Sequence, residues 1–252
     1  MQKWALVTGA TVGIGESFTR VLAEEGYNLI LCARTESILN QRASELRSAY
    51  PIEVKVLVAD LDSECERVES FIKSHQIDVL INNAGFGLNQ SFSRSNVEDE
   101  EKVLSVLVRA PMRLSHAVIP QMKEGKSGIV INVSSVAGFI AGGHYSAAKS
   151  FITVLSESLA TELKPHGVSV MALCPGFTHT EFHQRAGMKM GGLPEFMWLD
   201  SDFLVRKAWR DVNRGVVVST PGWQYKFLLF VMKILPRKIV RSISISLRSR
   251  QR

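Results

Sequence analysis

A glycine-rich turn, Gly9-Ala10-Thr11-Val12-Gly13-Ile14-Gly15, lies between the first apolar run of this chain and its first helical stretch. The run 4–7 is rich in strand-forming residues, and a helix is expected over 16–25, ending before Gly26. Glycines let a backbone turn sharply and approach a pyrophosphate closely, and a helix N-terminus adds unpaired N–H groups and the positive end of its dipole. A plain tight turn is the alternative, but the strand before the glycines and the helix after them favour a nucleotide-binding loop.

The alternation of strand and helix continues through most of the 252 residues. Short apolar runs alternate with helical stretches of ten or more residues, which is typical of βαβ units and a parallel sheet. The runs lack a polar face, as expected for strands covered by helices on both sides. The sequence therefore predicts a single α/β domain over residues 1–252, a Rossmann-type, doubly wound parallel sheet with helices on both faces. Expected strands cover 4–7, 29–33, 54–58, 78–82, 128–133 and 168–173, and expected helices cover 16–25, 35–49, 63–74, 97–122 and 145–163.

Further motifs follow the expected strands in a fixed order. Asp60-Leu61 follows the third strand, Asn82-Asn83-Ala84-Gly85 the fourth, Ser135 the fifth and Pro175-Gly176 the sixth, and Tyr145-Ser146-Ala147-Ala148-Lys149 forms a Y-x-x-x-K motif. Together with the G-x-x-x-G-x-G spacing of the glycine turn, this set resembles the short-chain dehydrogenase/reductase family over residues 4–182. Ligands of open parallel sheets bind outside the carboxyl ends of the strands, where these residues fall. The resemblance implies an oxidoreductase that transfers hydride between a nicotinamide cofactor and a carbonyl or alcohol.

Tyr145 and Lys149 are the expected proton-transfer pair. A free tyrosine has a pKa of about 10 and is a poor acid–base group at neutral pH, but a nearby ammonium lowers that pKa. The two side chains are four residues apart on an expected helix and so share one face. Ser135 can donate a hydrogen bond to the substrate oxygen and hold it near Tyr145. In the family these three residues have these catalytic roles, and the lysine also holds the nicotinamide ribose; a surface tyrosine and lysine that share a helical face are the alternative.

The end of the second expected strand bears on the choice of cofactor. An acid there would bind the ribose hydroxyls of NAD and repel a 2′-phosphate, but this chain has Ala33 followed by Arg34. A guanidinium can pair bidentately with a phosphate, so we expect NADP(H); an ordinary surface arginine is the alternative. The resemblance places Asp60 at the adenine, Asn83 near the adenosine ribose, and Thr178 with Thr180 at the nicotinamide. The residues expected to bind the cofactor are Gly9, Thr11, Val12, Gly13, Ile14, Gly15, Arg34, Asp60, Leu61, Asn83, Ala84, Gly85, Tyr145, Lys149, Pro175, Gly176, Thr178 and Thr180.

Two positions depart from the family pattern. Leu107 stands where many members have an asparagine that helps to position a water in the proton relay to the lysine. The leucine side chain cannot replace that amide, but its backbone carbonyl is still available to the water, so the efficiency of the relay is in question and not the reaction class. The loop from Ser135 to Tyr145 is shorter than in many members, which predicts a more open site beside the tyrosine.

His144, His179 and His183 have no accompanying pattern of metal ligands, so no metal site is expected.

Two segments near the end of the chain bear on substrate and partners. Residues 181–205 are rich in methionine and aromatic residues and resemble a lid over a greasy, adaptable pocket, with ordinary packing as the alternative. Residues 223–252 form a basic amphipathic tail: nine lysines and arginines and no acid follow Asp211, although the net charge of the whole chain is only +6. Its apolar run is too short to span a bilayer. The tail is interpretable as a peripheral contact with an anionic membrane, a cover over the substrate site, a contact with a second subunit or a solvated end; no nucleic-acid partner is expected.

Cysteine usage and the first residues bear on the compartment. Cys32, Cys65 and Cys174 are few and far apart, as in proteins of a reducing compartment. No apolar segment with a cleavage site precedes the first strand, so a secretory signal is not expected. We therefore expect a cytoplasmic protein, associated with the inner membrane surface if the tail binds lipid. The resemblance further implies a homodimer or homotetramer.

These features predict NADP(H)-dependent reduction of a hydrophobic or long-chain 3-oxo substrate to a secondary alcohol, with Tyr145 as the proton donor. The stretch 177–183 resembles an actinobacterial branch of the family that includes reductases of mycolic acid precursors. One alternative is a dehydrogenase or reductase of a steroid-like or other small apolar carbonyl. Another, from a different class, is a cofactor-binding sensor or scaffold with little turnover, which Leu107 suggests.

Overall fold

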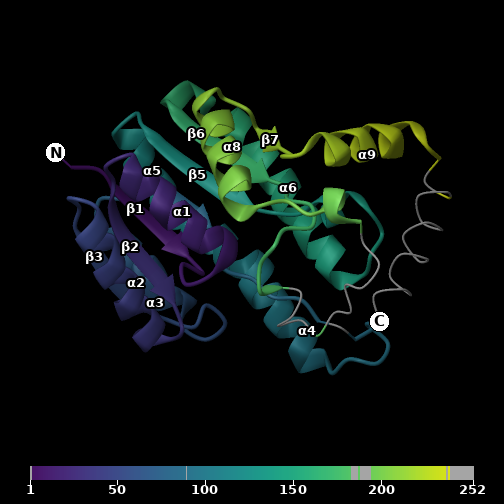
Figure 1. Ribbon diagram of the computed structural model, residues 1–252, viewed down its shortest axis with the longest axis horizontal. Helices are drawn as coiled ribbons and strands as arrows, with labels where there is room; N and C mark the ends of the chain where they lie inside the picture. Colours follow the sequence, from purple (N-terminus) through teal and green to yellow (C-terminus); the bar gives the residue numbers. More distant parts are fainter. Residues whose placement is uncertain (1, 89, 183–186, 188–193, 237, 239–252) are drawn as a thin grey trace.

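The fold is a seven-stranded parallel sheet between two layers of helices. The structure, a computed structural model, describes residues 2–88, 90–182, 187, 194–236 and 238. The strand order in its sheet is β3-β2-β1-β4-β5-β6-β7, and every pairing is parallel (Figure 1). This arrangement confirms the single-domain, doubly wound α/β fold that the sequence predicts. The strands are β1 (Trp4–Thr8), β2 (Asn28–Ala33), β3 (Val54–Val58), β4 (Val79–Asn82), β5 (Gly128–Val133), β6 (Val168–Leu173) and β7 (Val218–Ser219).

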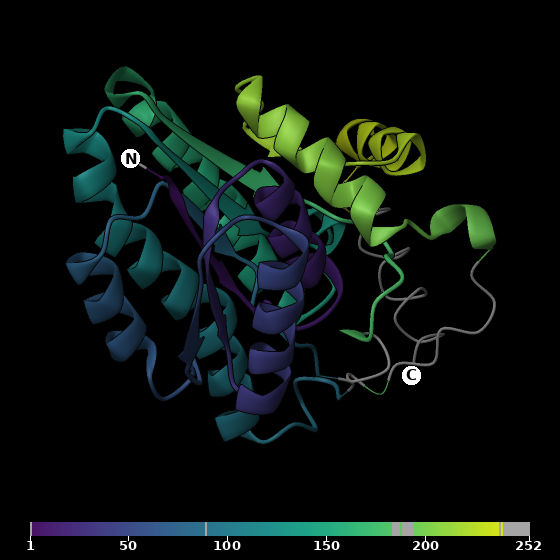
Figure 2. The ribbon, with the colours of Figure 1, turned by 60° about the vertical axis from the view of Figure 1, so that its left-hand side comes forward.

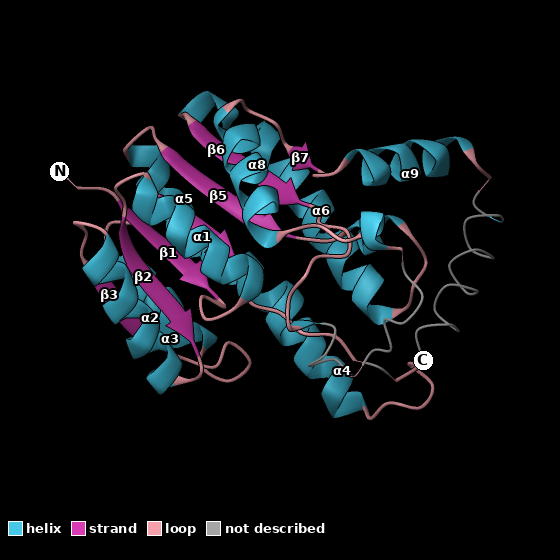
Figure 3. Cartoon of the chain, in the orientation of Figure 1, coloured by secondary structure: helices cyan, strands magenta, loops and turns pink. Residues whose placement is uncertain are grey.

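Helices connect the strands and lie on both faces of the sheet (Figures 2 and 3). Most begin and end within three residues of the expected bounds, since their limits are marked by glycine or by a polar stretch. The α-helices are α1 (Gly13–Glu24), α2 (Glu36–Ala49), α3 (Cys65–Ser74), α4 (Val97–Leu104), α5 (Ala110–Glu124), α6 (His144–Leu163), α8 (Ser201–Asn213) and α9 (Trp223–Ile234). Shorter turns are η1 (Ser105–Arg109), η2 (Val136–Phe139), η3 (Lys164–His166) and η4 (Glu195–Met197).

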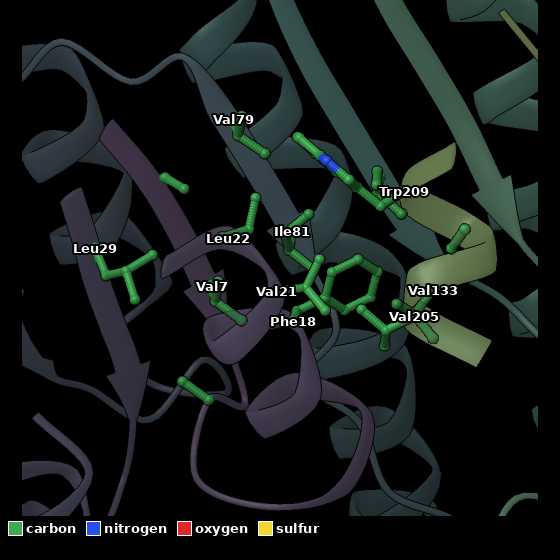
Figure 4. Close-up of a cluster of buried hydrophobic side chains, with 14 of the residues drawn as sticks. Val7, Phe18, Val21, Leu22, Leu29, Val79, Ile81, Val133, Val205 and Trp209 are labelled. Carbon is green, nitrogen blue, oxygen red and sulfur yellow. The ribbon is translucent and has the colours of Figure 1, made fainter. Parts of the chain in front are cut away.

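The apolar runs supply two cores because successive strand residues point to opposite faces. In β1, Ala5 and Val7 join the core under α1, α2 and α8, whereas Leu6 joins the core under α3, α5 and α6. Figure 4 shows the first of these cores, which includes Val7 of β1 and Phe18 of α1. The side chains of Ala5, Leu6 and Val7 are all fully buried, which explains why the strand has no polar face.

The long helix expected over 97–122 is not uniform. It consists of α4 and α5 joined by the π-helical turn η1, in which the Ala110 N–H donates to the Ser105 carbonyl. Pro111 has no N–H, so residue 111 cannot donate to the Leu107 carbonyl in an α-helical register. A π-turn is a common way for a helix to absorb such a break, and such turns are frequent at functional sites. This turn was not predicted from the sequence.

Two further elements were not predicted. β7 has two residues and extends the sheet through the pairs Ala172 with Val218 and Leu173 with Ser219. The valines at 216–218 are its only sequence signal, and the run is too short to separate from a loop. α8 begins where the Asp200 carboxylate accepts a hydrogen bond from the Phe203 N–H, and it covers the same face of the sheet as α1. The chain then turns at Gly222 into α9, which extends away from the sheet (Figure 1).

Candidate active site

The glycine turn lies at the carboxyl end of β1 and requires glycine for two different reasons. Gly9 and Gly13 have φ angles of +64° and +56°, in the left-handed region that side chains disfavour. Gly15 needs its small size instead, because a Cβ there would lie 2.0 Å from the Gly9 carbonyl oxygen. The start of α1 therefore packs directly against the backbone of the turn.

The N-terminus of α1 is open toward the site. Its N-cap residue, Val12, has no side-chain acceptor for the first N–H groups of the helix. Thr180, from the loop after β6, lies over the turn, and a Cβ on Gly13 would be 2.7 Å from its Cγ2 atom. A pyrophosphate suits this cradle of glycine backbone and uncapped N–H groups, which the Thr180 side chain borders. Thr11 is buried and Ile14 packs against the core, so these two positions offer the site mainly their backbones.

Asn83 ties the loop after β4 to the glycine turn. Its Nδ2 donates to the carbonyl oxygens of Thr8, at 3.0 Å, and Gly9, at 3.1 Å. The Thr8 hydroxyl in turn accepts from the N–H groups of Asn83 and Ala84. The family resemblance implies that Asn83 lies near the adenosine ribose; in the structure its amide protons hold the turn in shape, which accounts for an asparagine here independently of any contact with ribose.

Arg34 and Asp60 meet at the carboxyl ends of β2 and β3. An Arg34 guanidinium nitrogen lies 3.8 Å from an Asp60 carboxylate oxygen, and 73% of the Arg34 side chain is exposed. A pair this open and this long contributes little energy, so the guanidinium is free to move to a phosphate. Asp60 is fixed more firmly, since its carboxylate accepts from the Asp62 N–H at 3.0 Å. Leu61 is buried in the core and presents only its backbone.

The loops after β4 and β6 complete the rim. A Cβ on Gly85 would lie 2.8 Å from the Leu107 side chain and 4.0 Å from Lys149 Nζ, so Ala84-Gly85 adjoins Lys149. Pro175 accepts a hydrogen bond from the Val136 N–H at 3.0 Å, which joins the loops after β5 and β6. Gly176 lies against the ring of Tyr225, and Thr178 is buried, with its hydroxyl donating to the Gly176 carbonyl.

Ser135 and Tyr145 come together at the end of β5. Ser135 follows the strand and caps η2, where its hydroxyl accepts from the Ala137 N–H at 3.1 Å. Tyr145 is the second residue of α6, and its phenol is hydrogen-bonded to the Ser135 side chain. Burial raises the pKa of Tyr145 to about 12, and the Ser135 hydrogen bond opposes that rise. The phenol is therefore protonated at neutral pH and able to donate.

Lys149 is buried one helical turn after Tyr145. Its Nζ donates to the Val133 carbonyl at 2.7 Å and lies 5.7 Å from the centre of the Tyr145 ring. Burial lowers the pKa of Lys149 to about 8. The expectation that the ammonium lowers the pKa of Tyr145 is wrong for this structure. The two side chains do share a face, but the Lys149 nitrogen donates to a backbone carbonyl, and burial of the phenol sets the direction of the pKa shift.

Leu107 lies in the π-helical turn η1 and is fully buried. It forms a small apolar cluster with Val103 and Ala148, against which Tyr145 packs. The residue that replaces the family asparagine therefore makes the floor of the site apolar. The Leu107 carbonyl remains beside Pro111, whose nitrogen cannot donate to it.

Glu100 and His144 form a pair that the sequence analysis missed. The His144 Nδ1 and a Glu100 carboxylate oxygen are hydrogen-bonded, and the Ser95 hydroxyl donates to the other oxygen. Glu100 is buried, although it lies in an acidic stretch that reads as a solvated helix face. The pair ties α4 to the residue before Tyr145.

Within the described residues, no group of three or more histidine, cysteine or acidic side chains could hold a metal ion; His183 lies outside them.

The lid segment is described at 181–182, 187 and 194–205; Met188, Met190 and Leu193 lie outside the described residues. Phe182 approaches Tyr145, with 5.9 Å between the ring centres. Trp198 stacks on His179 at 4.8 Å and contacts Phe177 at 5.9 Å. The described part of this segment thus places the aromatic ring of Phe182 beside Tyr145.

Comparisons with known proteins agree with this geometry. A family model described as short chain dehydrogenase matches residues 3–190. A curated relative from Anas platyrhynchos, named very-long-chain 3-oxoacyl-CoA reductase, is 30% identical over 251 residues, 95% of this chain and 78% of the relative. A protein of the same name from Pyrenophora tritici-repentis is 34% identical over 181 residues, 68% of this chain but only 53% of that protein. A solved short-chain dehydrogenase from Sphingobium yanoikuyae, in complex with NADPH, superposes with a TM-score of 0.84 at 31% identity and covers 93% of this chain and 96% of its own.

The fold and the site define a nicotinamide-dependent oxidoreductase of the Rossmann type. The chain belongs to the short-chain dehydrogenase/reductase family. Its relatives include proteins named very-long-chain 3-oxoacyl-CoA reductase.

Proposed function

We propose that this protein uses NADPH to reduce the ketone of a long-chain 3-oxoacyl thioester to a secondary alcohol. The observation that carries the proposal is the set Ser135, Tyr145 and Lys149 at the carboxyl edge of the sheet, beside an open helix N-terminus and Arg34. The names of the relatives support the acyl substrate, and the Phe182 ring beside Tyr145 suits an apolar chain. The resemblance to an actinobacterial branch remains a prediction.

The residues present fit a bound NADP(H). The glycine turn and Thr180 would hold the pyrophosphate, and Arg34 would pair with the 2′-phosphate. Asp60 would contact the adenine, and Thr178 the nicotinamide end. When bound, the cofactor supplies the hydride.

The protein's own residues would manage the proton. Ser135 would donate a hydrogen bond to the ketone oxygen, and Tyr145 would give its proton to the alkoxide as it forms. A phenol with a raised pKa is in the correct state for that donation at neutral pH. Lys149, with a pKa of about 8, can exchange a proton near neutral pH and so return one to the tyrosine. The residues 181–205 would close over the acyl chain as a lid.

Turnover with a ketone panel tests the proposal. We expect NADPH-dependent reduction of 3-oxoacyl-CoA substrates, with kcat/KM rising with chain length because more apolar surface is buried. Reduction of cyclic or steroid ketones alone would favour the steroid-like alternative. No turnover of any ketone, with intact NADPH binding, would favour a sensor or scaffold.

Tyr145→Phe is the matched control for that assay, since it keeps the ring and removes the proton. We expect kcat to fall on the order of 100- to 10,000-fold. NADPH binding, measured by fluorescence titration, should be unchanged. A Phe variant with near-normal kcat would contradict the assignment of Tyr145.

A further inference from the structure

α9 carries an exposed apolar stripe. Trp223, Phe227, Phe230 and Ile234 are spaced by four, three and four residues, which places them on one face of the helix. Trp223 is 74% exposed and the other three are between 61% and 68% exposed. Helices of globular proteins normally turn such a stripe toward the core. This helix instead points it away from the protein.

The orientation of the stripe is fixed by two polar anchors at the start of α9. The Tyr225 hydroxyl donates to the Met197 carbonyl and accepts from the Phe177 N–H at 2.8 Å. Gln224 donates to the Phe196 carbonyl at 3.0 Å. Both side chains are buried, and Gly176 leaves the space that the Tyr225 ring fills. The helix is therefore held against η4 of the lid segment, with its apolar face outward.

The lid continues the apolar surface. Phe196 is 61% exposed, and a groove of about 360 Å³ runs between it and α9. The acid next to it, Glu195, is paired with His179. The groove is lined by Phe196, Met197, Trp223, Gln224, Phe227, Leu228 and Val231.

Positive charge borders this apolar surface. Lys226 and Lys233, seven residues apart, lie along one side of the stripe and are exposed. In the sequence no acid follows Asp211, whereas nine lysines and arginines do. An apolar stripe of aromatic residues bordered by lysines is typical of helices that lie in the interface of an anionic membrane.

We propose that α9 and Phe196 form a docking face for the surface of an anionic lipid bilayer, with α9 in the plane of the headgroups. A second copy of the chain fits this face less well, because it would bring an equally positive tail against the first. A span is excluded for α9, since 12 residues reach about 18 Å against a hydrocarbon core of roughly 30 Å. In the part of the chain that the structure describes, no helix meets the length and hydropathy needed to cross a membrane. Docking would place the lid at the lipid surface, and it does not depend on the reaction proposed above.

Vesicle flotation of the full chain, without substrate, tests the docking face. We expect binding to vesicles of phosphatidylcholine with phosphatidylglycerol, little binding to phosphatidylcholine alone, and weaker binding as salt rises. Lys226→Glu with Lys233→Glu should weaken binding at least about tenfold, since each basic residue near an anionic surface contributes about 1 kcal/mol. Lys3→Glu with Lys164→Glu makes the same change in net charge on exposed residues outside the face and should bind like the unmodified chain.

The stripe is tested by its own variants. Phe227→Ser with Phe230→Ser should lose vesicle binding while keeping the sedimentation coefficient and thermal unfolding of the unmodified chain, because both rings are exposed. Brominated lipid should quench Trp223 fluorescence. Trp223→Phe should keep binding and lose that quenching, since the other three tryptophans are far less exposed.

The proposal is overturned if the full chain ignores anionic vesicles at low salt. It is also overturned if the two lysine pairs weaken binding equally, or if bound protein leaves Trp223 unquenched, which would assign binding to other parts of the chain. Dissociation of an oligomer by the Phe227 and Phe230 changes would show that a second copy covers the stripe.

Discussion

Lys149 donates a hydrogen bond from its Nζ to the Val133 carbonyl, at 2.7 Å, although only 6% of the lysine is exposed. Among the residues that the structure describes, this ammonium has one carbonyl partner and no carboxylate, and burying an ammonium in this way is costly. Burial accordingly lowers the pKa of Lys149 to about 8 from a usual 10.5. Lys149 therefore lowers the stability of the folded chain at neutral pH.

Lys149→Met should change how stability depends on pH. The pKa of Lys149 is lower in the folded chain than in the unfolded chain, so the unfolded chain binds more protons between pH 8 and 10.5. This lysine therefore destabilises the fold at neutral pH. The destabilisation disappears as the pH rises to 10.5. The lowered pKa corresponds to a destabilisation of roughly 3 kcal/mol by Lys149 at neutral pH, at about 1.36 kcal/mol per pKa unit. The methionine variant loses part of this gain, about 1–3 kcal/mol, because it leaves the Val133 carbonyl unpaired. Urea unfolding of both proteins from pH 7 to 10 should show the stability of the unmodified chain rising relative to the variant. A difference that is constant over this range would contradict the lowered pKa.

Arg34→Ala should separate the two nicotinamide cofactors. The exposed guanidinium, 3.8 Å from Asp60, is free to pair with a 2′-phosphate that only NADPH carries. We expect NADPH binding to weaken by roughly 1.5–3 kcal/mol, as for a hydrogen bond to a charged group, with little change for NADH. Titration of both cofactors measures this. Equal losses for the two would mean that Arg34 does not select the cofactor.

The sequence predicted the parts of the site that depend on backbone and spacing. Glycine turns and strand ends have fixed positions relative to a parallel sheet, so Gly9, Gly13 and the residues after β4, β5 and β6 converge as expected. It could not predict the pKa of Tyr145, because a spacing of four gives a shared face but not the balance between burial and the ammonium. The same holds for Glu100 and His144, which are 44 residues apart and meet only through the packing of α4 on α6.

Leu107→Asn should change kcat by less than about tenfold, or under ~1.4 kcal/mol of barrier. The backbone carbonyl of residue 107 lies beside Pro111, which cannot donate to it, and is unchanged by the substitution. The amide would, however, enter the apolar cluster with Val103 and Ala148, so we expect a lower melting temperature. Steady-state kinetics and thermal unfolding measure the two effects. A much larger gain in kcat would show that Leu107 makes the proton relay inefficient in the unmodified chain, and it would favour the sensor alternative.

The protein should self-associate by pairing its two long helices, α5 and α6, around a two-fold axis. The family resemblance led to this expectation, and the surface supports it: Phe151 and Val154 are exposed on one face of α6, and Met112 is exposed on α5. Two-fold interfaces of this kind are large and apolar. Phe151→Glu with Val154→Glu should therefore convert a dimer or tetramer into smaller species in sedimentation at micromolar concentration. Phe203→Glu, which changes an exposed phenylalanine on α8 instead, should leave the oligomer intact. If the unmodified chain is a monomer, or if the α8 variant dissociates it equally, the pairing of α5 and α6 is wrong.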